Sequence, residues 1–327
     1  MSLDPALLAR AVDLLKAGEL VALPTETVYG LGADASNPAA VAKIFAAKGR
    51  PADHPLIVHL PGDAWLERWA RNIPQAAWDL AEMFWPGPLT LILKKQPWVP
   101  DAVTGGQDTV GLRVPGHPIA LELLKAFADS GEPHPGGIAA PSANRFGRIS
   151  PTTAAHVQEE LGDKVPLILD GGPCQVGIES TIIDLSRARP EILRPGHISP
   201  LRLGEVLGEL PAQHESQDAP RVSGSLESHY APITPVRLIA PERLLDFLTL
   251  QRHAGIRCGV LAHDQPAQAG MPHLWRMLPA DPAGYAHELY GALRDLDHQQ
   301  LDLIVVETPP ASPPWGAIRD RLRRAAA

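Results

Sequence analysis

The segment from Leu20 to Leu60 constrains the fold more than any other part of the chain. It reads LVALPTETVYGLGADASNPAAVAKIFAAKGRPADHPLIVHL. An apolar run at 20–23 predicts a buried strand that stops at Pro24, a helical pattern fills 39–47, and 56–60 predicts a second short strand. The loops of this strand–loop–helix–loop–strand unit carry hydroxyls, a carboxylate, two fixed cations and two imidazoles. Because α/β proteins place ligands at such loops, the unit predicts a site for an anionic, phosphate-bearing substrate beside a small polar one.

The same alternation of apolar runs and helical patterns continues to about residue 205. Strands are predicted at 20–24, 56–60, 89–93, 109–114, 137–140, 166–169, 181–185 and 190–193. Helices are predicted at 4–17, 38–48, 63–70, 74–83, 118–128, 152–161 and 200–208. This pattern is typical of an α/β domain with one large sheet. Many Pro and Gly residues lie at the strand edges, so we expect a twisted mixed sheet with flanking helices rather than a purely doubly wound one.

Residues 209–235 lose the apolar periodicity and gain Ser, Pro, Gln and Glu, which predicts a linker. A second, smaller alternation follows, with three strands expected at 236–240, 257–262 and 301–307. Its helices are expected at 241–252, 282–297 and 315–325. We therefore predict a catalytic domain over 1–208, a linker or lid over 209–235, and a small Rossmann-like three-layer α/β domain over 236–327.

Composition excludes several classes of protein. The net charge of −8 and the pI near 5.9 lack the excess positive charge of a dedicated nucleic-acid binder. The two cysteines, Cys174 and Cys258, have no ligand spacing, so a disulfide framework, a zinc cluster or another protein-bound metal is not expected. No uncharged apolar run approaches the roughly 20 residues that span a bilayer, and the N-terminus has no signal-peptide core. A cytoplasmic protein without a membrane segment is the simplest interpretation.

Lys48 and Arg50 form the first group with chemical meaning. Arginine offers a planar fork for phosphate or carboxylate, and lysine offers a compact charge. Two cations at the end of a helix also complement the helix dipole, so a purely structural role for this pair is the alternative. Pro51 and the nearby His54 and His59 favour a binding site.

Arg113 stands on a predicted strand that is otherwise built from Val and Leu. Thr109, Gly111 and Arg113 alternate, so they share one face of that strand. A buried guanidinium without a partner is costly, and Arg113 therefore needs a carboxylate. The partner could come from the protein, as an internal salt bridge, or from a ligand.

Two further segments combine turns with polar groups. In AAPSANRFGRISPTT (139–153) a strand ends at Pro141, Ser142 and Asn144 form a polar turn, and Ser150 leads into a helix start. Such a turn is either an anion cradle or a plain capped turn. In 177–196, Glu179-Ser180-Thr181 precede a strand and Arg194 closes the next one, which a β-hairpin with an edge arginine would also explain.

The order of these motifs carries more information than any one of them. PTETVYGLG, KGRP with PLIVH, TVGLRVPGHP, PSAN with SPT, ESTIIDL, LRPG and a linker HYAP together resemble the YrdC/Sua5 family of threonylcarbamoyl-AMP synthases. The resemblance covers nearly the whole chain, including the C-terminal Sua5-type domain that short YrdC proteins lack.

The resemblance implies a nucleotidyltransferase reaction. L-Threonine and bicarbonate give N-carboxy-threonine, which attacks the α-phosphorus of ATP with its Mg²⁺, and pyrophosphate leaves. A separate threonylcarbamoyl transferase complex then modifies adenosine 37 of tRNA, and direct tRNA binding by this protein stays open. No protein nucleophile is implied.

The resemblance also implies roles for individual residues, with Lys48 and Arg50 as the catalytic pair. The expected threonine ligands are Thr27, His59, Arg113 and Ser180 or Thr181. The expected ATP ligands are Arg50, His54, Thr109, Ser142, Asn144, Ser150, Arg194 and, from the linker, Tyr230.

This sequence departs from the family pattern at three places. His54 stands where the family usually has Asn or Lys, and its protonation varies near neutral pH. Phe146 replaces a small serine, which would tighten or reshape its turn. Leu226, Glu227 and Ser228 replace the basic residues that often precede HYAP.

Two alternatives belong to other functional classes. The first is an RNA-binding or ribosome-assembly protein with a YrdC-like domain, which the acidic balance and the scarcity of aromatic residues disfavour. The second is a carbamoyltransferase module of the hydrogenase-maturation type, whose zinc fingers two isolated cysteines cannot supply.

Overall fold

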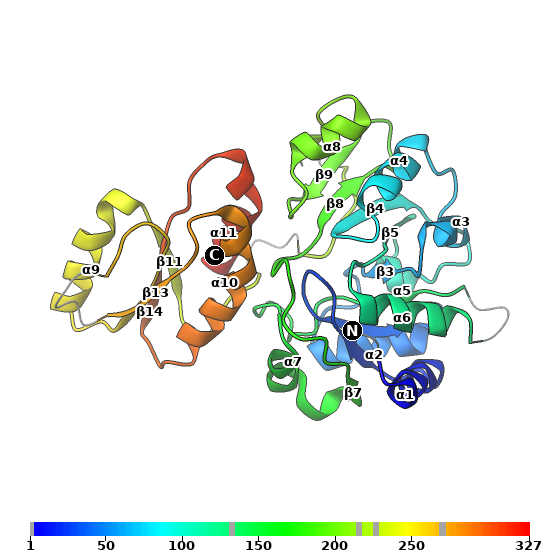
Figure 1. Cartoon of the computed structure of the whole chain (residues 1–327), viewed down its shortest axis with the longest axis horizontal. Coiled ribbons are helices and arrows are strands. Elements are labelled where there is room, and N and C mark those ends of the chain that lie inside the picture. The colour runs from blue at the N-terminus through cyan, green and yellow to red at the C-terminus, as the bar shows by residue number, and fades with distance from the viewer. Residues whose placement is uncertain (1–2, 131–134, 214–217, 225–228, 268–272) are drawn as a thin grey trace. The chain divides into compact units, whose positions relative to one another are not determined.

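The computed structural model describes residues 3–130, 135–213, 218–224, 229–267 and 273–327. The chain divides into two compact units (Figure 1). The first comprises Met1–Phe146, Pro151–Gln175 and Glu179–Ser225, and the second comprises Gly147–Ser150, Val176–Ile178 and Leu226–Ala327. Two short loops from the middle of the sequence therefore belong to the C-terminal unit. The domain boundaries expected at 208 and 235 stay a prediction.

The first unit is built on a mixed sheet with the strand order β10-β9-β8-β4-β5-β3-β6-β2-β1-β7. Parallel and antiparallel pairs alternate along much of this order, for example β4 with β5 antiparallel and β5 with β3 parallel. The expected mixed sheet is confirmed. Its strands are β1 (Val21–Leu23), β2 (Gly30–Asp34), β3 (Ile57–His59), β4 (Leu89–Lys94), β5 (Thr109–Arg113), β6 (Ile138–Ala139), β7 (Leu167–Ile168), β8 (Thr181–Asp184), β9 (Glu191–Arg194) and β10 (Ala212–Gln213).

Most helices of this unit lie close to their predicted ranges, but the short helix Asp101–Thr104 was not predicted. The helices are α1 (Pro5–Lys16), α2 (Pro38–Lys48), α3 (Leu66–Trp69), α4 (Gln75–Phe84), α5 (Asp101–Thr104), α6 (Pro118–Ala128), α7 (Ala154–Leu161) and α8 (Pro200–Leu207), with short 3₁₀ turns at Asp63–Trp65 and Gly162–Lys164. Helix α2 shows why the ends are well defined: the Asn37 side chain accepts from the backbone N–H of Ala39 (3.0 Å), and Gly49 ends the helix in the left-handed conformation.

The two faces of the sheet are covered differently. The larger core contains Val58, Leu91, Leu112 and Ile183 from the central strands together with buried residues of α2 and α4. On the other face, α1 and α6 pack over β1 and β6. The central strands turn Ile57, Ile92 and Ile182 to this second face, where they meet Val222 of the linker instead of a helix. The fold thus leaves the middle of one sheet face to be covered by a linker segment.

The segment Pro24–Asp34 differs from expectation. We expected Tyr29-Gly30-Leu31-Gly32 to be a glycine-containing loop, but Gly30–Asp34 is strand β2, which pairs antiparallel with β1. Glycine is required there for space, because a Cβ on Gly32 would come within 2.9 Å of both Ile138 and Leu23. Glycine has low strand propensity, so the pattern hid a strand that close packing makes necessary.

The linker also contains unexpected order within the described residues. Ala212–Gln213 forms β10, which extends the sheet by pairing parallel with β9. Residues 219 and 222 pack against the sheet. The expectation for Leu226, Glu227 and Ser228 lies outside the described residues.

The second unit contains a parallel sheet with the order β11-β14-β12-β13, so the expectation of three strands was wrong. The additional strand, β13, lies at an edge, is mostly exposed and has only four residues, which is too short for a clear alternation. Helix α9 packs on Cys258 and Val260, whereas Leu296 of α10 approaches Gly259 from the other face, so the three-layer α/β arrangement is confirmed. The elements are β11 (Val236–Ile239), α9 (Leu244–His253), β12 (Cys258–Ala262), β13 (Leu274–Met277), α10 (Pro282–Asp297), β14 (Leu303–Glu307) and α11 (Gly316–Ala325), with 3₁₀ turns at Pro241–Arg243 and Pro313–Trp315.

None of the helices in the described ranges has the length and apolarity needed to cross a bilayer.

Candidate functional site

Most of the predicted site residues of the first unit lie on or beside the sheet face that the linker covers. Side chains alternate along a strand, so the neighbours of the core residues point to this face. Strand β5 contributes Thr109 and Arg113, β3 contributes His59, and Ser180 directly precedes β8. In the β3–β5 ladder, His59 is the register partner of Arg113. The expectation that Thr109, Gly111 and Arg113 share one face is consistent with Thr109 and Gly111 lining the same hollow.

Arg113 is held by a carboxylate of the protein. Its Nη2 donates to Oε1 of Glu26 (2.6 Å) and to Oγ1 of Thr27 (2.9 Å), and its Nε donates to the carbonyl of Gly87. The second Glu26 oxygen accepts from the backbone N–H of Gly116 (2.8 Å). Both charges are buried. The internal salt bridge that the sequence left open is therefore present, while Nη1 of Arg113 donates to no described residue.

The Thr25-Glu26-Thr27 turn fixes this arrangement. Thr25 Oγ1 donates to the carbonyl of Val28 (2.6 Å), and it lies 2.8 Å from Thr27 Oγ1. Because the Thr25 proton goes to Val28, the Thr27 hydroxyl donates to Thr25 and accepts from Arg113. The loop between β1 and β2 thus presents a threonine hydroxyl and a glutamate to one guanidinium.

His59 is a neutral imidazole in this site. Burial, and next the charge of Arg113, lower its pKa to about 3. Its Nδ1 is buried without a hydrogen-bond partner among the described residues. A buried imidazole nitrogen that meets no protein group is a candidate contact for a bound molecule.

Ser180 binds the second buried cation of this sheet face, Arg194. Arg194 donates from Nη2 to Ser180 Oγ (3.0 Å) and from Nε to the Ser180 carbonyl, and Thr90 Oγ1 lies 2.8 Å from the same hydroxyl. The neighbouring Thr181 hydroxyl instead bonds both the N–H and the carbonyl of Ile198. Strands β8 and β9 do form the expected hairpin, but Arg194 is buried rather than exposed at an edge.

Arg50 and Arg194 meet at one serine of the linker. Arg194 Nη1 donates to the Ser223 carbonyl (2.9 Å), and the Arg50 guanidinium lies 3.4 Å from Ser223 Oγ. Arg50 also donates to the carbonyl of Pro55 (2.9 Å). Both arginines are buried. Two fixed cations on this face are therefore covered by the same short segment of the linker.

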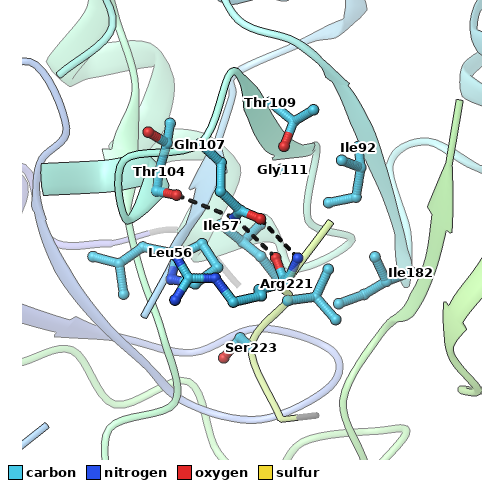
Figure 2. Close-up of a pocket in the computed structure, with 12 residues that line it drawn as sticks. Leu56, Ile57, Ile92, Thr104, Gln107, Thr109, Gly111, Ile182, Arg221 and Ser223 are labelled. Atoms are coloured by element: carbon cyan, nitrogen blue, oxygen red, sulfur yellow. Dashed lines mark hydrogen bonds between the residues drawn. The ribbon is translucent and has the colours of Figure 1, made fainter. Parts of the chain in front are cut away.

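The segment that covers them is anchored by side chains as well as by apolar contact. Figure 2 shows Gln107 facing Arg221: the Gln107 amide donates to the Arg221 carbonyl (3.1 Å) and accepts from its N–H (2.7 Å). The Arg221 side chain donates to the Gly105 carbonyl (2.9 Å). Arg221 and Ser223 of the linker line one side of a small hollow, and Thr109, Ile57 and Ile92 line it from the sheet (Figure 2).

Lys48 ends α2 but does not cap it. Its buried Nζ donates to the carbonyls of Ser142 (2.5 Å) and Asn144 (2.5 Å), so it holds the turn that follows β6. Burial, and next the charge of Arg50, lower its pKa well below the ordinary value. The helix-dipole explanation therefore does not account for Lys48. Its ammonium group instead holds the turn at Ser142 and Asn144, which is the predicted anion cradle.

The remaining predicted residues lie in two places. His54 is half-buried in the loop after α2, with a pKa lowered by burial and then by Arg50. Ser150 and Tyr230 belong to the second unit. There the Tyr230 ring is buried, with a positive φ of 63°, stacked on Tyr290 (5.9 Å between centroids) and facing the Arg321 guanidinium.

Sequence reasoning missed three residues of this network: Glu26, Thr90 and Ser223. Glu26 had a visible signal, because a buried Arg113 required a carboxylate and the Thr-Glu-Thr motif offered one. Thr90 had none, since a threonine in an apolar strand is ordinary. Ser223 lies in a polar segment where its contact with two arginines depends on tertiary folding.

Comparison with known proteins identifies the family. A threonylcarbamoyl-AMP synthase from Bacillus subtilis is 40% identical to this chain over 99% of it and 93% of its own length. The chain belongs to the YrdC/Sua5 family. The family model described as "Telomere recombination" matches residues 13–196, and the model of the threonylcarbamoyl-AMP synthase C-terminal domain matches 198–327.

Further family members agree over the same length. The threonylcarbamoyl-AMP synthase of Pyrococcus abyssi is 40% identical over 96% of this chain and 92% of its own. The crystal structure of P. abyssi Sua5 complexed with L-threonine superposes with a TM-score of 0.89, at 38% identity, over 98% of this chain and 94% of that one. The family resemblance seen in the sequence is thereby confirmed for the whole chain.

Proposed function

We propose that this protein is a threonylcarbamoyl-AMP synthase that condenses L-threonine, bicarbonate and ATP into threonylcarbamoyl-adenylate and pyrophosphate. One observation carries the proposal. The polar network on one sheet face consists of two hydrogen-bonded groups, Glu26 with Arg113, and Ser180 and Ser223 with Arg194 and Arg50. The same face thus offers an arginine suited to an amino-acid carboxylate and a pair of cations suited to phosphates.

Threonine would bind at the Arg113 end of the network. Nη1 of Arg113 is the guanidinium donor left for the substrate carboxylate, because Nε and Nη2 are used by Gly87, Glu26 and Thr27. Neutral His59 would offer Nδ1 to a polar group of the amino acid. Ser180 or Thr181 would contribute a hydroxyl, and each would exchange a present partner for the substrate: Arg194 or Thr90 at Ser180, and Ile198 at Thr181.

ATP would bind at the cationic end. Arg50 and Arg194 would contact its phosphates once Ser223 has moved away, and Lys48 would stabilise the phosphate cradle from behind. The full set of proposed ATP ligands is Arg50, His54, Thr109, Ser142, Asn144, Ser150, Arg194 and Tyr230. Mg²⁺ would enter with the triphosphate as part of the substrate.

The reaction needs positioning and charge more than a protein nucleophile. The threonine nitrogen adds to bicarbonate with loss of water, and an oxygen of the resulting carbamate forms a bond to the α-phosphorus. The bond from that phosphorus to the pyrophosphate oxygen breaks, and Mg²⁺ accompanies the leaving group. Negative charge gathers on the phosphoryl oxygens in the transition state, where Arg50 and Lys48 would stabilise it.

The product is a mixed anhydride between a carbamate and AMP, so it is an activated acyl donor. We propose that it serves the N6-threonylcarbamoyl modification of adenosine 37 in tRNA, through a separate transferase complex in the cytoplasm. Contact between this chain and that complex would be transient, and direct tRNA binding is not required for the chemistry.

The direct test measures pyrophosphate release by the purified full-length protein with ATP, Mg²⁺, bicarbonate and L-threonine. Omission of threonine, or its replacement by L-alanine, is the matched control. We expect release that depends on threonine and a threonylcarbamoyl-adenylate product detectable by mass spectrometry. Folded protein that releases no pyrophosphate, but binds RNA in a salt-dependent manner, would instead support an RNA-binding protein with a YrdC-like domain.

A further inference from the structure

Helix α10 of the C-terminal unit holds a loop from the middle of the sequence. The Arg294 side chain, which is buried, donates from Nη2 to the backbone carbonyl of Ile149. Ile149 itself is buried. Burying a guanidinium is costly unless its donors are used, so this contact fixes the loop more firmly than apolar packing alone would.

The end of the same helix makes a second connection to this loop. Asp297 lies 3.6 Å from the Arg148 guanidinium and accepts from the backbone N–H of Thr234 (2.7 Å). The N–H of Ala231 donates to the carbonyl of Gly147 (2.9 Å). The loop Gly147–Ser150 is therefore tied both to α10 and to residues 231–234 at the end of the linker.

A second loop touches α10 earlier along the helix. Gly177 has a φ of +83°, and a Cβ at this position would come within 2.5 Å of the Ala286 carbonyl oxygen and 2.6 Å of the His287 Cα. Only glycine allows the loop backbone to approach the helix backbone so closely. The loop Val176–Ile178 is thus fitted to one turn of α10.

Both loops are continuous with proposed substrate residues. Ser150 ends the first loop, and Glu179-Ser180-Thr181 begins directly after the second. We propose that α10 positions these two loops, so that Arg294 sets the ATP-binding segment and Gly177 sets the approach to the threonine-binding segment. The inference rests on the proposed function and assigns the C-terminal domain a role in assembling the substrate site.

The test for the first loop compares Arg294→Met with Arg276→Met. Arg276 also pairs with α10, through Glu288 (3.3 Å), but it is half-exposed and bonds neither loop among the described residues. For Arg294→Met we expect the KM for ATP, and the Kd for a non-hydrolysable ATP analogue, to rise about tenfold, the scale of one lost charge-assisted hydrogen bond. We expect kcat and the KM for threonine to stay within about twofold of the wild type, and Arg294→Lys to restore part of the affinity.

The test for the second loop compares Gly177→Ala with Gly291→Ala. Gly291 lies on α10 with open space around it, so alanine there should leave the KM values for ATP and threonine unchanged. Gly177→Ala should raise the KM for threonine and leave that for ATP nearly unchanged.

Equal substrate constants in each variant and its matched control would overturn the proposal. If Arg294→Met fails to fold, Asp297→Asn and Arg294→Lys provide the same comparison with smaller perturbations. The two hypotheses fail separately. A wild-type protein that binds the analogue but releases no pyrophosphate with threonine would refute the proposed function, while a variant effect on analogue binding would still support positioning by α10.

Discussion

His54 and Phe146 are in direct contact: their ring centroids lie 5.4 Å apart, with the planes at 72°. The two residues come from two different loops, and each is expected from the sequence to depart from the family pattern. The Phe146 N–H also donates to the carbonyl of Lys48 (2.9 Å), which brings the two loops together. His54 and Phe146 therefore form one edge-to-face aromatic pair beside the proposed phosphate site.

A double-mutant cycle should detect this pair. We expect His54→Asn and Phe146→Ser each to destabilise the protein, and the double variant to lose less than the sum by about 0.5–1.5 kcal/mol. Urea unfolding of the four proteins measures the coupling. Additive losses within experimental error would mean that the rings merely lie near each other.

Arg50 should matter for ATP and little for folding. We expect Arg50→Ala to raise the KM for ATP by more than about tenfold, because a phosphate would lose a charge-assisted hydrogen bond. Arg202→Ala is the matched control, since Arg202 is an exposed arginine that pairs with the exposed Glu205. A variant that unfolds, but keeps full activity per folded molecule, would assign Arg50 to helix stabilisation instead.

Glu26 should act through Arg113 on threonine binding. Glu26→Gln keeps the shape of the side chain but removes the charge that orients the guanidinium, so we predict a higher KM for threonine and an unchanged KM for ATP. Glu26→Ala should also cost about 3–5 kcal/mol of stability, because it leaves Arg113 buried without its carboxylate. Steady-state kinetics with each substrate varied, together with urea unfolding, distinguishes these effects. Equal rises in both KM values would argue against a specific threonine contact.

The linker should move when nucleotide binds, because Ser223 accepts hydrogen bonds from Arg50 and Arg194, the two cations proposed to bind the phosphates. Trypsin cleavage after Arg221, whose side chain is about half-exposed, reports this movement. We expect saturating ATP analogue to change the cleavage rate severalfold. We expect Gln107→Ala to speed cleavage without nucleotide, because it removes the two hydrogen bonds that hold the Arg221 backbone. A cleavage rate unaffected by the analogue would show that the linker is not a lid.

His59 predicts a pH dependence of stability. Its pKa is about 3 in the folded protein and about 6.5 when unfolded, so below pH 6.5 the unfolded chain binds a proton that the folded one does not. The stability associated with neutral His59 is therefore complete above about pH 6.5 and falls as the pH drops towards 3, by at most about 1.4 kcal/mol per pH unit. Urea unfolding of the wild type and His59→Gln at pH 7, 6 and 5 tests this. Parallel curves would mean that His59 titrates normally in the folded state.

Much of the fold could be predicted because periodicity is a local signal. The helices α2 and α6 begin at capped prolines and lie within the predicted ranges. Strand β2 could not be predicted, since Gly30 and Gly32 are selected by contacts with Leu23 and Ile138 that only the folded chain creates. Strand β13 was missed for another reason: its four residues at the edge of the sheet are too few to show a strand period.

The sequence predicted which residue types the site contains better than it predicted which of them bond to each other. A buried Arg113 requires a carboxylate partner, which the sequence indicates. The partner is Glu26, from a loop nearly ninety positions away in the sequence. Lys48 looked like a helix cap, yet its ammonium group reaches Ser142 and Asn144. Such pairings depend on sheet order, which the chain alone does not specify.

The second unit is discontinuous in the sequence, and this has a practical consequence for protein engineering. Because Gly147–Ser150 and Val176–Ile178 belong with the C-terminal part, no single cut separates the halves as it would in a tandem arrangement. A chimera that exchanges only the residues after 225 would pair a foreign α10 with native loops. Recombination between relatives should therefore transfer both short loops, of four and three residues, together with the C-terminal part, as one discontinuous module.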